Sequence, residues 1–404
     1  MTAFIIILTL ILIAVIAVQI GKLTELAAEI RGEEEALKDS NNFNAAMMLV
    51  FLVLFLSGVI FSSVYYMNEM LGYGPNISAS VHGSSLDSTF NITLFFTGIV
   101  FVVTHILLFW YAYKFKEVKG RKALFMPHNN TLEVVWTAIP AVVMTFLVVN
   151  GLDTWNEVMA DVSEDEEYIE IEATAQQFGW IIRYPGPDGL LGTRNYQLIE
   201  PGTNDLGLDW TDEKTHDDII SSSVGEHFYL PKDKKVRVRI IAKDVLHNFY
   251  LPHFRVKMDA VPGLPTYFVF TPNTTTEEYK ARLGKLDDEG NPMYPEWHRP
   301  VDKDDPESLP RWKSFEYELA CAELCGKGHF SMKRLLRIVE EPEYKSWLAD
   351  QKSYYPTSVM GTDADPFKEE NLKKMEAEKA KEEAEVTENA EEATEETAET
   401  AETD

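Results

Sequence analysis

The chain has 404 residues, of which 45% are hydrophobic and 25% are charged, and its formal net charge is −28 at pH 7. Because phosphate backbones attract basic surfaces, so acidic a chain argues against a nucleic-acid partner. Two cysteines are too few for a disulfide framework. The acidic surface serves either solubility or the attraction of a basic protein partner.

The first 155 residues contain four long runs without Asp, Glu, Lys or Arg. They cover residues 1–21, 41–68, 88–113 and 134–152. Each run is long enough for a helix that crosses a hydrocarbon core of roughly 30 Å. A buried helix in a soluble core is the alternative for any one run, but four runs together predict four transmembrane helices.

The charges of the loops predict how these helices are oriented, because loops rich in Lys and Arg stay in the cytoplasm. Residues 69–87 contain no Lys or Arg, whereas residues 114–122 contain five. The N-terminus and everything after the fourth run are therefore expected outside the cytoplasm. The first run could instead be a signal peptide, but residues 1–4 carry no positive charge and no small-x-small cleavage site follows, so we expect an uncleaved anchor.

Three residues in or beside the runs are notable. His105 lies in the middle of the third run, where an ionisable group is usually functional or paired, and we expect it to hydrogen-bond a helix partner. Pro140 is predicted to kink the fourth helix. Glu133 precedes the fourth run and is expected to be an interfacial helix cap.

Short alternating runs follow the fourth apolar run. Apolar and polar side chains alternate in residues 168–173 and 236–240, and residues 267–270, 315–319 and 335–339 are further candidate strands. Turns rich in Pro and Gly separate them. Short strands without long helices between them predict an antiparallel sandwich or barrel.

Polar segments interrupt and end this β region. Residues 203–225 and 273–311 are predicted to be surface loops, and residues 343–352 to form a short helix. Residues 361–404 contain 17 acidic and five basic side chains. From about Asp363 the Ala, Glu, Lys and Thr composition cannot bury a core, so disorder with some transient helix is predicted.

Residues 321–332 bring together both cysteines, a histidine and a methionine, which are soft and borderline ligands that suit copper. A local disulfide or thiol exchange would have no use for His329 and Met332. Zinc would favour two Cys and two His, with Met superfluous. A blue copper site uses a single Cys, two His and a weak Met, so this loop has one cysteine more. Two thiolates can bridge two copper ions.

A binuclear site of this kind needs a second imidazole from outside the loop. His247 follows Asp244-Val245-Leu246 at the end of a predicted strand and is the better candidate. His253, which follows Pro252, is the weaker one. Structural or solvent roles are expected for the other histidines, at positions 82, 105, 128, 216, 227 and 298.

These motifs resemble subunit II of cytochrome c oxidase, a haem–copper respiratory oxidase. Residues 321–332 match the family's binuclear copper motif Cys-x-Glu-x-Cys-Gly-x-x-His-x-x-Met. Residues 244–247 match its upstream half, and residues 257–263 continue the family pattern. Residues 133–140 match the start of its last membrane helix, and the resemblance covers roughly residues 88–344.

The resemblance implies a binuclear copper site of six ligands. These would be the thiolates of Cys321 and Cys325, the imidazoles of His247 and His329, the thioether of Met332 and the backbone carbonyl of Glu323. The two thiolates would bridge the copper ions, and each imidazole would hold one ion. The carboxylate of Glu323 would help to bind a magnesium ion shared with subunit I.

The resemblance also implies the function. The chain would accept electrons from reduced cytochrome c and pass them to haem in subunit I, where oxygen is reduced to water and protons are translocated. Glu133 would sit at the mouth of a proton pathway. Phe178 stands where the family has a tryptophan, so electron entry is expected at Phe178 and Trp180. No Cys-x-x-Cys-His occurs, so the donor is expected to be a separate protein.

The implied fold is a membrane-helical N-terminal region, a cupredoxin-like Greek-key barrel and a disordered acidic tail. The partners would be subunit I, other oxidase subunits, cytochrome c and membrane lipid, and the copper domain would lie on the periplasmic face of a bacterial inner membrane. The expected divisions are two extra transmembrane helices with their loops (1–42 and 43–87), a two-helix membrane hairpin (88–157), the copper domain (158–345), and a short helix with the tail (346–404).

Three other functions fit the sequence less well. Quinol oxidase subunits share the fold but lack the copper ligands, all of which are present here. Nitrous oxide reductase shares the copper motif but is soluble and carries a propeller domain that this chain lacks. A disulfide-stapled membrane anchor without catalytic function would leave the histidine and methionine of the loop unexplained.

Overall fold

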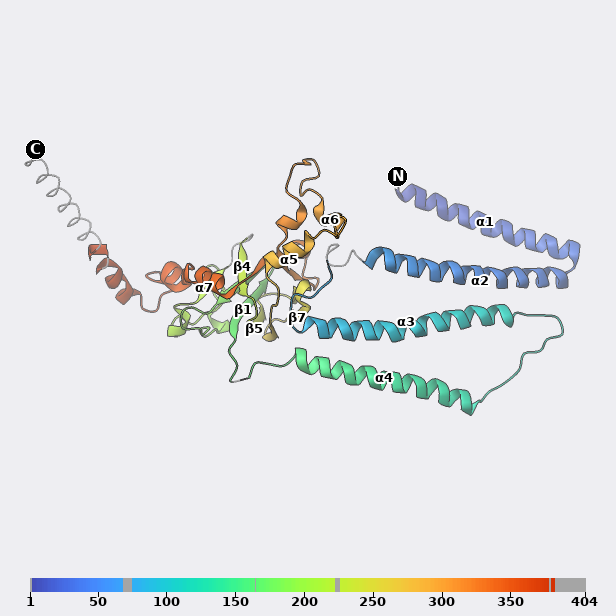
Figure 1. Ribbon diagram of the computed structural model, residues 1–404, viewed down its shortest axis with the longest axis horizontal. Coiled ribbons are helices and arrows are strands. Elements are labelled where there is room, and N and C mark those ends of the chain that lie inside the picture. Colours follow the sequence, from blue (N-terminus) through green and yellow to red (C-terminus); the bar gives the residue numbers. More distant parts are fainter. Residues whose placement is uncertain (1, 68–74, 164, 222–225, 378, 382–404) are drawn as a thin grey trace, which may run out of the picture. The chain divides into compact units, whose positions relative to one another are not determined.

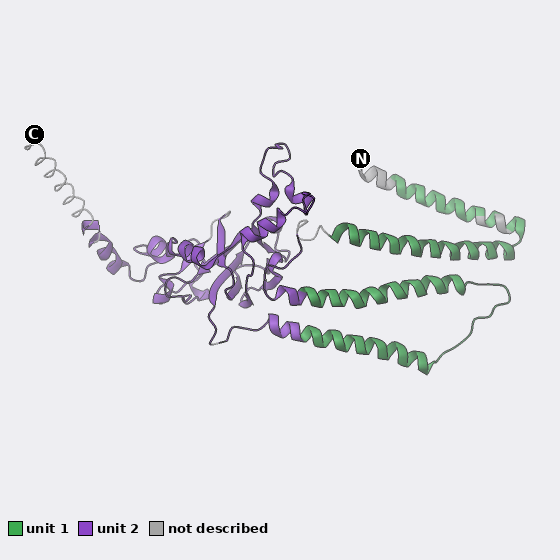
Figure 2. Ribbon diagram, viewed as in Figure 1, with its two compact units in different colours: residues 1–70, 87–152 green, residues 71–86, 153–404 purple. Residues whose placement is uncertain are grey.

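The computed structural model describes residues 2–67, 75–163, 165–221, 226–377 and 379–381. The chain divides into two compact units, as Figure 2 shows. The first comprises residues 1–70 and 87–152 and is helical. The second comprises residues 71–86 and 153–404 and contains all the described strands.

Four long helices account for the helical unit (Figure 1). They are α1 (Thr2–Arg31), α2 (Glu33–Tyr66), α3 (Gly83–Lys114) and α4 (Asn130–Val158). Among the described residues, α2, α3 and α4 are long and apolar enough to cross a membrane, which confirms three of the predicted spans. Within α1 the described apolar stretch is shorter, Leu8–Leu23, so the first span stays a prediction.

The polar side chain in the middle of α3 has a structural role. His105 Nδ1 lies 2.7 Å from the carbonyl oxygen of Phe101, one helical turn earlier. Its ring also stacks on Phe55 of α2, with 5.4 Å between ring centroids. The expected hydrogen bond is therefore present, and its partner is the histidine's own helix. Pro140 lies within α4, which is assigned as one helix from Asn130 to Val158.

Two five-stranded sheets form the second unit (Figure 1). The first has the order β3 (Ile219–Ser221), β2 (Gly179–Tyr184), β1 (Ile169–Gln176), β5 (Val236–Ala242), β8 (Thr266–Phe270). The second has the order β4 (His227–Pro231), β10 (Lys333–Val339), β9 (Tyr317–Cys321), β6 (His247–Leu251), β7 (Val256–Ala260). All five predicted strands are therefore confirmed, as β1, β5, β8, β9 and β10.

One hydrophobic core joins the two sheets. Ile171 and Val238 from the first sheet and Phe249 and Leu319 from the second are all fully buried in it. The alternation predicted for β5 places Val238 inside and its charged neighbours toward solvent. Between described strands, β1–β5 and β4–β10 pair in parallel and the other six pairs are antiparallel. The wholly antiparallel prediction is therefore wrong for two pairs.

The second predicted surface loop contains a buried helix. Helix α5 (Thr276–Leu283) starts with a capping box in which Thr275 and Glu278 bond each other's backbone N–H groups. Tyr279 and Leu283 on this helix are fully buried in the main core. The surface-loop prediction is thus wrong for α5, and the short helix α6 (Pro295–His298) follows it.

The first predicted surface loop and the C-terminal segment together form a second, smaller core. Its buried side chains are Ile181, Leu206, Leu208, Trp210, Tyr355 and Val359. Beyond α7 (Glu341–Ala349), the Tyr355 hydroxyl donates to Asp365 Oδ1 at 2.7 Å and Asn371 Nδ2 donates to Asp365 Oδ2 at 2.9 Å. Disorder from Asp363 onward is therefore wrong as far as Asn371. Residues 372–377 and 379–381 are helical, and residues 382–404, which hold the remainder of the predicted tail, lie outside the described residues.

Candidate metal centre

Strand ends bring the predicted ligands to one edge of the second sheet. Strand β6 begins at His247 and its antiparallel neighbour β9 ends at Cys321, with Phe249 paired to Cys321. Because the two strands run in opposite directions, the start of one and the end of the other share an edge. The loop after Cys321 returns through a short 3₁₀ helix (His329–Ser331) to Met332, immediately before β10.

Backbone hydrogen bonds close this loop on itself. The Cys321 N–H donates to the Met332 carbonyl at 3.1 Å, and the Ala322 N–H donates to the Asn248 carbonyl at 3.2 Å. The side-chain amide of Gln177, from the turn between β1 and β2, donates to the Cys325 carbonyl. The two ends of the loop are therefore bonded to each other, its start is bonded to β6, and its middle is bonded to the turn between β1 and β2.

The ligand atoms follow one another in a chain. His247 Nδ1 lies 3.8 Å from Cys321 Sγ, and the two cysteine sulfurs are 3.8 Å apart. Cys325 Sγ is in turn 3.7 Å from His329 Nδ1 and 3.7 Å from Met332 Sδ. A sulfur–sulfur separation of this size is far too long for a disulfide, and both thiols are free. The arrangement is two thiols in the middle with an imidazole at either end.

The thiols are shielded from water. Cys325 is 4% exposed and Met332 only 1%, while His247 is completely buried and His329 partly buried. Burial, reinforced by the neighbouring thiol of Cys321, raises the pKa of Cys325 to about 11. The free thiol therefore keeps its proton at neutral pH, and a metal that binds there must displace it.

A carboxylate outside the ligand set orients His247. Asp244 Oδ1 accepts from His247 Nε2 at 2.8 Å, and Asp244 Oδ2 accepts from the Gln177 backbone N–H at 2.7 Å. Burial raises the pKa of Asp244, but the hydrogen bonds from His247, Gln177 and Val245 outweigh it and lower the pKa overall. An ionised Asp244 can only accept, so Nε2 carries the proton and Nδ1 presents its lone pair to Cys321.

These donors fit a soft transition metal. The ligand atoms of His247, Cys321 and Cys325 all lie within 4.8 Å of one another, which makes them a group that could hold a metal ion. The carbonyl oxygen of Glu323 lies 3.2 Å from Cys321 Sγ and offers a further donor. Thiolate and imidazole donors with a thioether suit copper. The Glu323 carboxylate belongs to no cluster of metal-ligating side chains within the described part of the chain.

The two candidate histidines lie in different surroundings. His253 lies in the 3₁₀ helix Pro252–Phe254 and packs edge-on against Tyr279, Phe315 and Tyr317 at 5.3–5.5 Å between ring centroids. Burial lowers the pKa of His253 to about 4. The cysteines therefore meet His247, whereas His253 is enclosed by aromatic rings.

The two aromatic residues expected at the electron entry differ in exposure. Phe178 is 39% exposed and covers the metal loop so closely that a Cβ on Gly328 would lie 2.5 Å from its ring. Trp180 is buried, and its ring meets that of His247 at 6.4 Å between centroids. Phe178 thus lies at the protein surface against the metal loop, and Trp180 lies in the interior next to His247.

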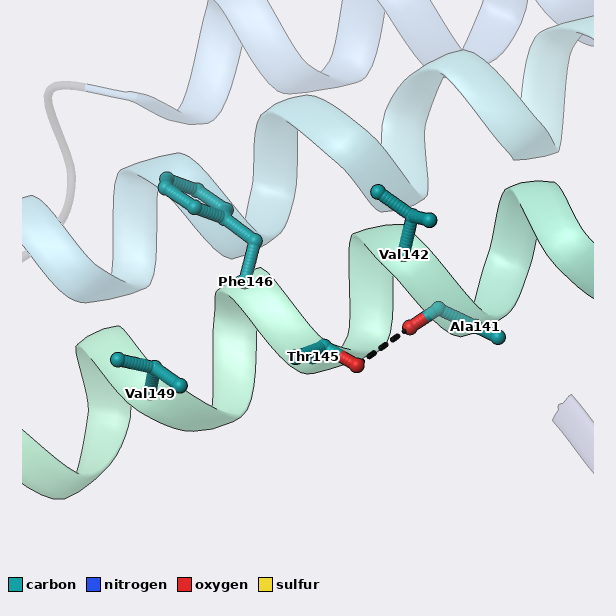
Figure 3. Close-up of a pocket in the computed structure, with 5 residues that line it drawn as sticks. All are labelled: Ala141, Val142, Thr145, Phe146 and Val149. Carbon is teal, nitrogen blue, oxygen red and sulfur yellow. Dashed lines mark hydrogen bonds between the residues drawn. The ribbon is translucent and has the colours of Figure 1, made fainter.

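The membrane helix α4 carries the expected proton-path residue. Glu133 Oε1 accepts from the Asn129 backbone N–H at 3.3 Å, so its carboxylate caps the start of the helix as expected. Glu133 also lines an open hollow with Thr137. A second hollow further along α4, shown in Figure 3, is apolar except for Thr145, whose hydroxyl donates to the Ala141 carbonyl at 2.8 Å. It offers no reactive group.

Sequence reasoning missed the residues that support the ligands. The Asp244–His247 spacing was visible in the sequence, but the bond between these side chains depends on the turn that joins them. The contacts of Gln177 with Asp244 and Cys325 connect positions 67 and 148 residues apart. No local pattern could have indicated them.

Comparison with known proteins identifies the family to which this chain belongs. Residues 68–153 match the family model for the cytochrome c oxidase subunit II transmembrane domain, and residues 208–278 match that for its periplasmic domain. The alternative cytochrome c oxidase subunit 2 of Bradyrhizobium diazoefficiens is 31% identical over 269 residues, which cover 67% of this chain and 81% of that protein. The chain belongs to the cytochrome c oxidase subunit II family.

More distant relatives match as well. Cytochrome c oxidase subunit 2 of Thermostichus vulcanus is 23% identical over 287 residues, covering 67% of this chain and 76% of that protein. Among solved structures, the periplasmic domain of cytochrome oxidase subunit II from Bradyrhizobium japonicum is 24% identical, with a TM-score of 0.26, and covers 47% of this chain and 95% of that domain. As a subunit II, this chain is part of a haem–copper cytochrome c oxidase, with membrane-spanning helices and a periplasmic domain.

Proposed function

We propose that this subunit is the electron-entry point of its oxidase and holds a binuclear copper centre. It would take electrons from reduced cytochrome c in the periplasm and pass them to haem in subunit I, where oxygen is reduced to water and protons are translocated. The observation that carries the proposal is the buried sequence of donor atoms from His247 through Cys321 and Cys325 to His329.

Two metal ions use this donor set more completely than one. A single ion bound by His247, Cys321 and Cys325 would leave His329 and Met332 without a function, although both approach Cys325 within 3.7 Å. With Cys321 and Cys325 shared, His247 would hold one ion and His329 the other, and the Glu323 carbonyl and Met332 would complete the donor set. Each ion would then have two thiolates, one imidazole and one weak ligand.

The protein's own contribution is a rigid and dry site. A copper pair, when bound, supplies reversible one-electron transfer. Asp244 fixes the tautomer and the orientation of His247, and the backbone bonds of Cys321 and Ala322 hold the loop in one position. Burial of Cys325 and Met332 keeps water away from the sulfurs. Ligands held in this way move little when an electron arrives or leaves.

Exposed apolar side chains around the site suit contact with other proteins. Leu324 and Phe330 of the metal loop are 80% and 88% exposed, and Phe178, from the turn between β1 and β2, packs against Gly326 and Gly328 of this loop. We assign Phe178 to the contact with the donor because it is partly exposed, packs against the metal loop and stands two residues before Trp180, whose ring meets that of His247. The donor is a separate cytochrome c.

Four finer assignments belong to the same proposal. The two sheets with their common core are those of a cupredoxin-like Greek-key barrel. The partly exposed Glu323 carboxylate contributes to a magnesium site completed by subunit I. Glu133, which lines an open hollow beside Thr137, stands at the mouth of a proton pathway into subunit I. The membrane helices contact lipid and the other oxidase subunits.

Copper loading of two histidine variants tests the proposal. His247→Ala removes a proposed ligand and should lose most of the bound copper of the purified full-length chain. His253→Ala is the matched control, because it removes a buried imidazole of the same domain that faces aromatic rings, and it should retain copper. Metal analysis by mass spectrometry measures both. Equal copper loss in the two folded variants would refute the assigned ligand set.

A further inference from the structure

A buried arginine stands on β10, just after the metal loop ends. Arg334 is 5% exposed and stands two residues after Met332, on the same face of β10 as the buried Leu336. Its neighbour Lys333 points to solvent, with its ammonium 2.7 Å from Glu318. Arginine keeps its charge in proteins, so the inner face of β10 carries a positive charge next to the sulfur ligands.

No carboxylate of the described residues forms a hydrogen bond or an ion pair with Arg334. Burial lowers the pKa of Arg334 overall, although the exposed Glu226 raises that pKa through space. Arg334 Nη1 donates to the Trp180 carbonyl at 3.0 Å, Nη2 donates to the Ser221 hydroxyl, and Nε has no partner in the described part of the chain. The equally buried Arg183 shows the contrast, because it pairs with Glu172 at 3.0 Å and with Asp218 at 2.7 Å. Buried charges are normally paired, so an arginine without a carboxylate partner requires a reason.

Two short routes connect Arg334 to the proposed copper ligands. The first route passes through Trp180. Arg334 donates to its backbone carbonyl, and the centroid of its indole ring lies 6.4 Å from that of the His247 ring. Along β10 Arg334 reaches Met332, whose sulfur is 3.7 Å from Cys325. Charges act over longer distances in a protein interior than in water, because the interior polarises less. A fixed cation in this position acts on the metal site.

We propose that Arg334 raises the reduction potential of the copper centre and holds Trp180 against His247. This inference rests on the proposed function. The oxidised centre carries one positive charge more than the reduced centre, so a nearby cation repels the oxidised form more strongly. Reduction adds one electron, and Arg334 neither gives up a proton nor changes its bonds. The effect makes the centre a better acceptor for its donor.

A charge-removal variant tests the proposal. Arg334→Met replaces the guanidinium with an apolar chain of similar length, and Arg334→Lys keeps the charge. We expect a lower midpoint potential for Arg334→Met in a spectroelectrochemical titration of the copper-loaded full chain, and a potential near that of the unaltered chain for Arg334→Lys. Lys333→Met, which removes an exposed charge one residue away, should leave the potential nearly unchanged because solvent screens it.

A second variant covers the case in which Arg334→Met does not fold. Ser221→Asp places a carboxylate where the Ser221 hydroxyl now accepts from Arg334, so it neutralises the charge without removing the arginine. It should lower the potential as Arg334→Met does, whereas Ser221→Asn should not. An unshifted potential in a copper-replete Ser221→Asp or Arg334→Met variant overturns the inference. Absence of a copper pair in the unaltered chain would instead refute the proposed function itself.

Discussion

At the scale of single residues, His247 and His253 show how surroundings decide chemistry. One end of the His247 ring is held by Asp244 at 2.8 Å and the other faces Cys321 at 3.8 Å. His253 lies just beyond the other end of β6, surrounded by aromatic rings. The first is therefore suited to bind a metal, and the second is a buried neutral imidazole.

Removing the carboxylate behind His247 should weaken metal binding without destroying the site. Asp244→Asn can still contact Nε2, but it loses the negative charge that strengthens the imidazole as a ligand. Partners of this kind typically change metal affinity by about 10–100-fold, and we expect a loss in that range. Competition with a copper chelator measures it. Asp259→Asn, which alters a carboxylate bonded to Asn248 instead, is the control and should bind copper normally.

The buried imidazole of His253 should make the domain sensitive to acid. Its pKa is about 4 in the folded protein and about 6.5 in an unfolded chain, so the unfolded state binds the additional proton first. Stability should therefore fall as the pH drops from about 6.5 to 4, by about 3 kcal/mol in total from this group. Thermal melting of the copper-free chain measures the slope. A His253→Gln variant with an unchanged slope would contradict this explanation.

At the scale of elements, the sequence predicted some features and missed others for identifiable physical reasons. Alternation along β1 and β5 is a local pattern, so the strands were predictable, as was the metal loop with its closely spaced ligands. The parallel pairing of β1 with β5 was not predictable, because it depends on which distant segments of the chain come together in the fold. The burial of Tyr279 on α5 was missed because its segment is polar on average, although one face packs on the core.

The C-terminal segment was missed for the same reason. Its composition is that of a disordered tail, yet Asp365 accepts from the Tyr355 hydroxyl, Asn371 and the backbone N–H of Gly361. A few well-placed polar side chains therefore anchor a stretch with little apolar content. Average composition describes such a segment poorly, because the anchoring is specific to individual residues.

A single substitution tests whether this anchor is real. Asp365→Ala leaves four donors without their acceptor, because the Phe367 backbone N–H also donates to Asp365, and it should lower the free energy of unfolding by about 1–3 kcal/mol. Asp363→Ala, which removes an exposed carboxylate two residues earlier, should have little effect. Urea denaturation of the two variants measures both values. Equal stabilities would show that the segment contributes nothing to the fold.

At the scale of the whole molecule, membership of the subunit II family means that the metal loop belongs to a membrane enzyme. Apolar helices secure the chain in the membrane, and the β domain presents the His247, Cys321 and Cys325 group in the periplasm. Under the proposed function, the net charge of −28 would attract a basic donor protein. The chain would then combine a membrane anchor, a donor surface and a buried electron-transfer site.

The central claim is that one chain holds two copper ions that share an electron. Metal analysis combined with electron paramagnetic resonance of the oxidised, purified chain tests it most directly. We predict two copper ions per chain and a spectrum whose hyperfine splitting comes from two equivalent copper nuclei. One copper ion per chain with the splitting of a single nucleus, or zinc in its place, would contradict the account.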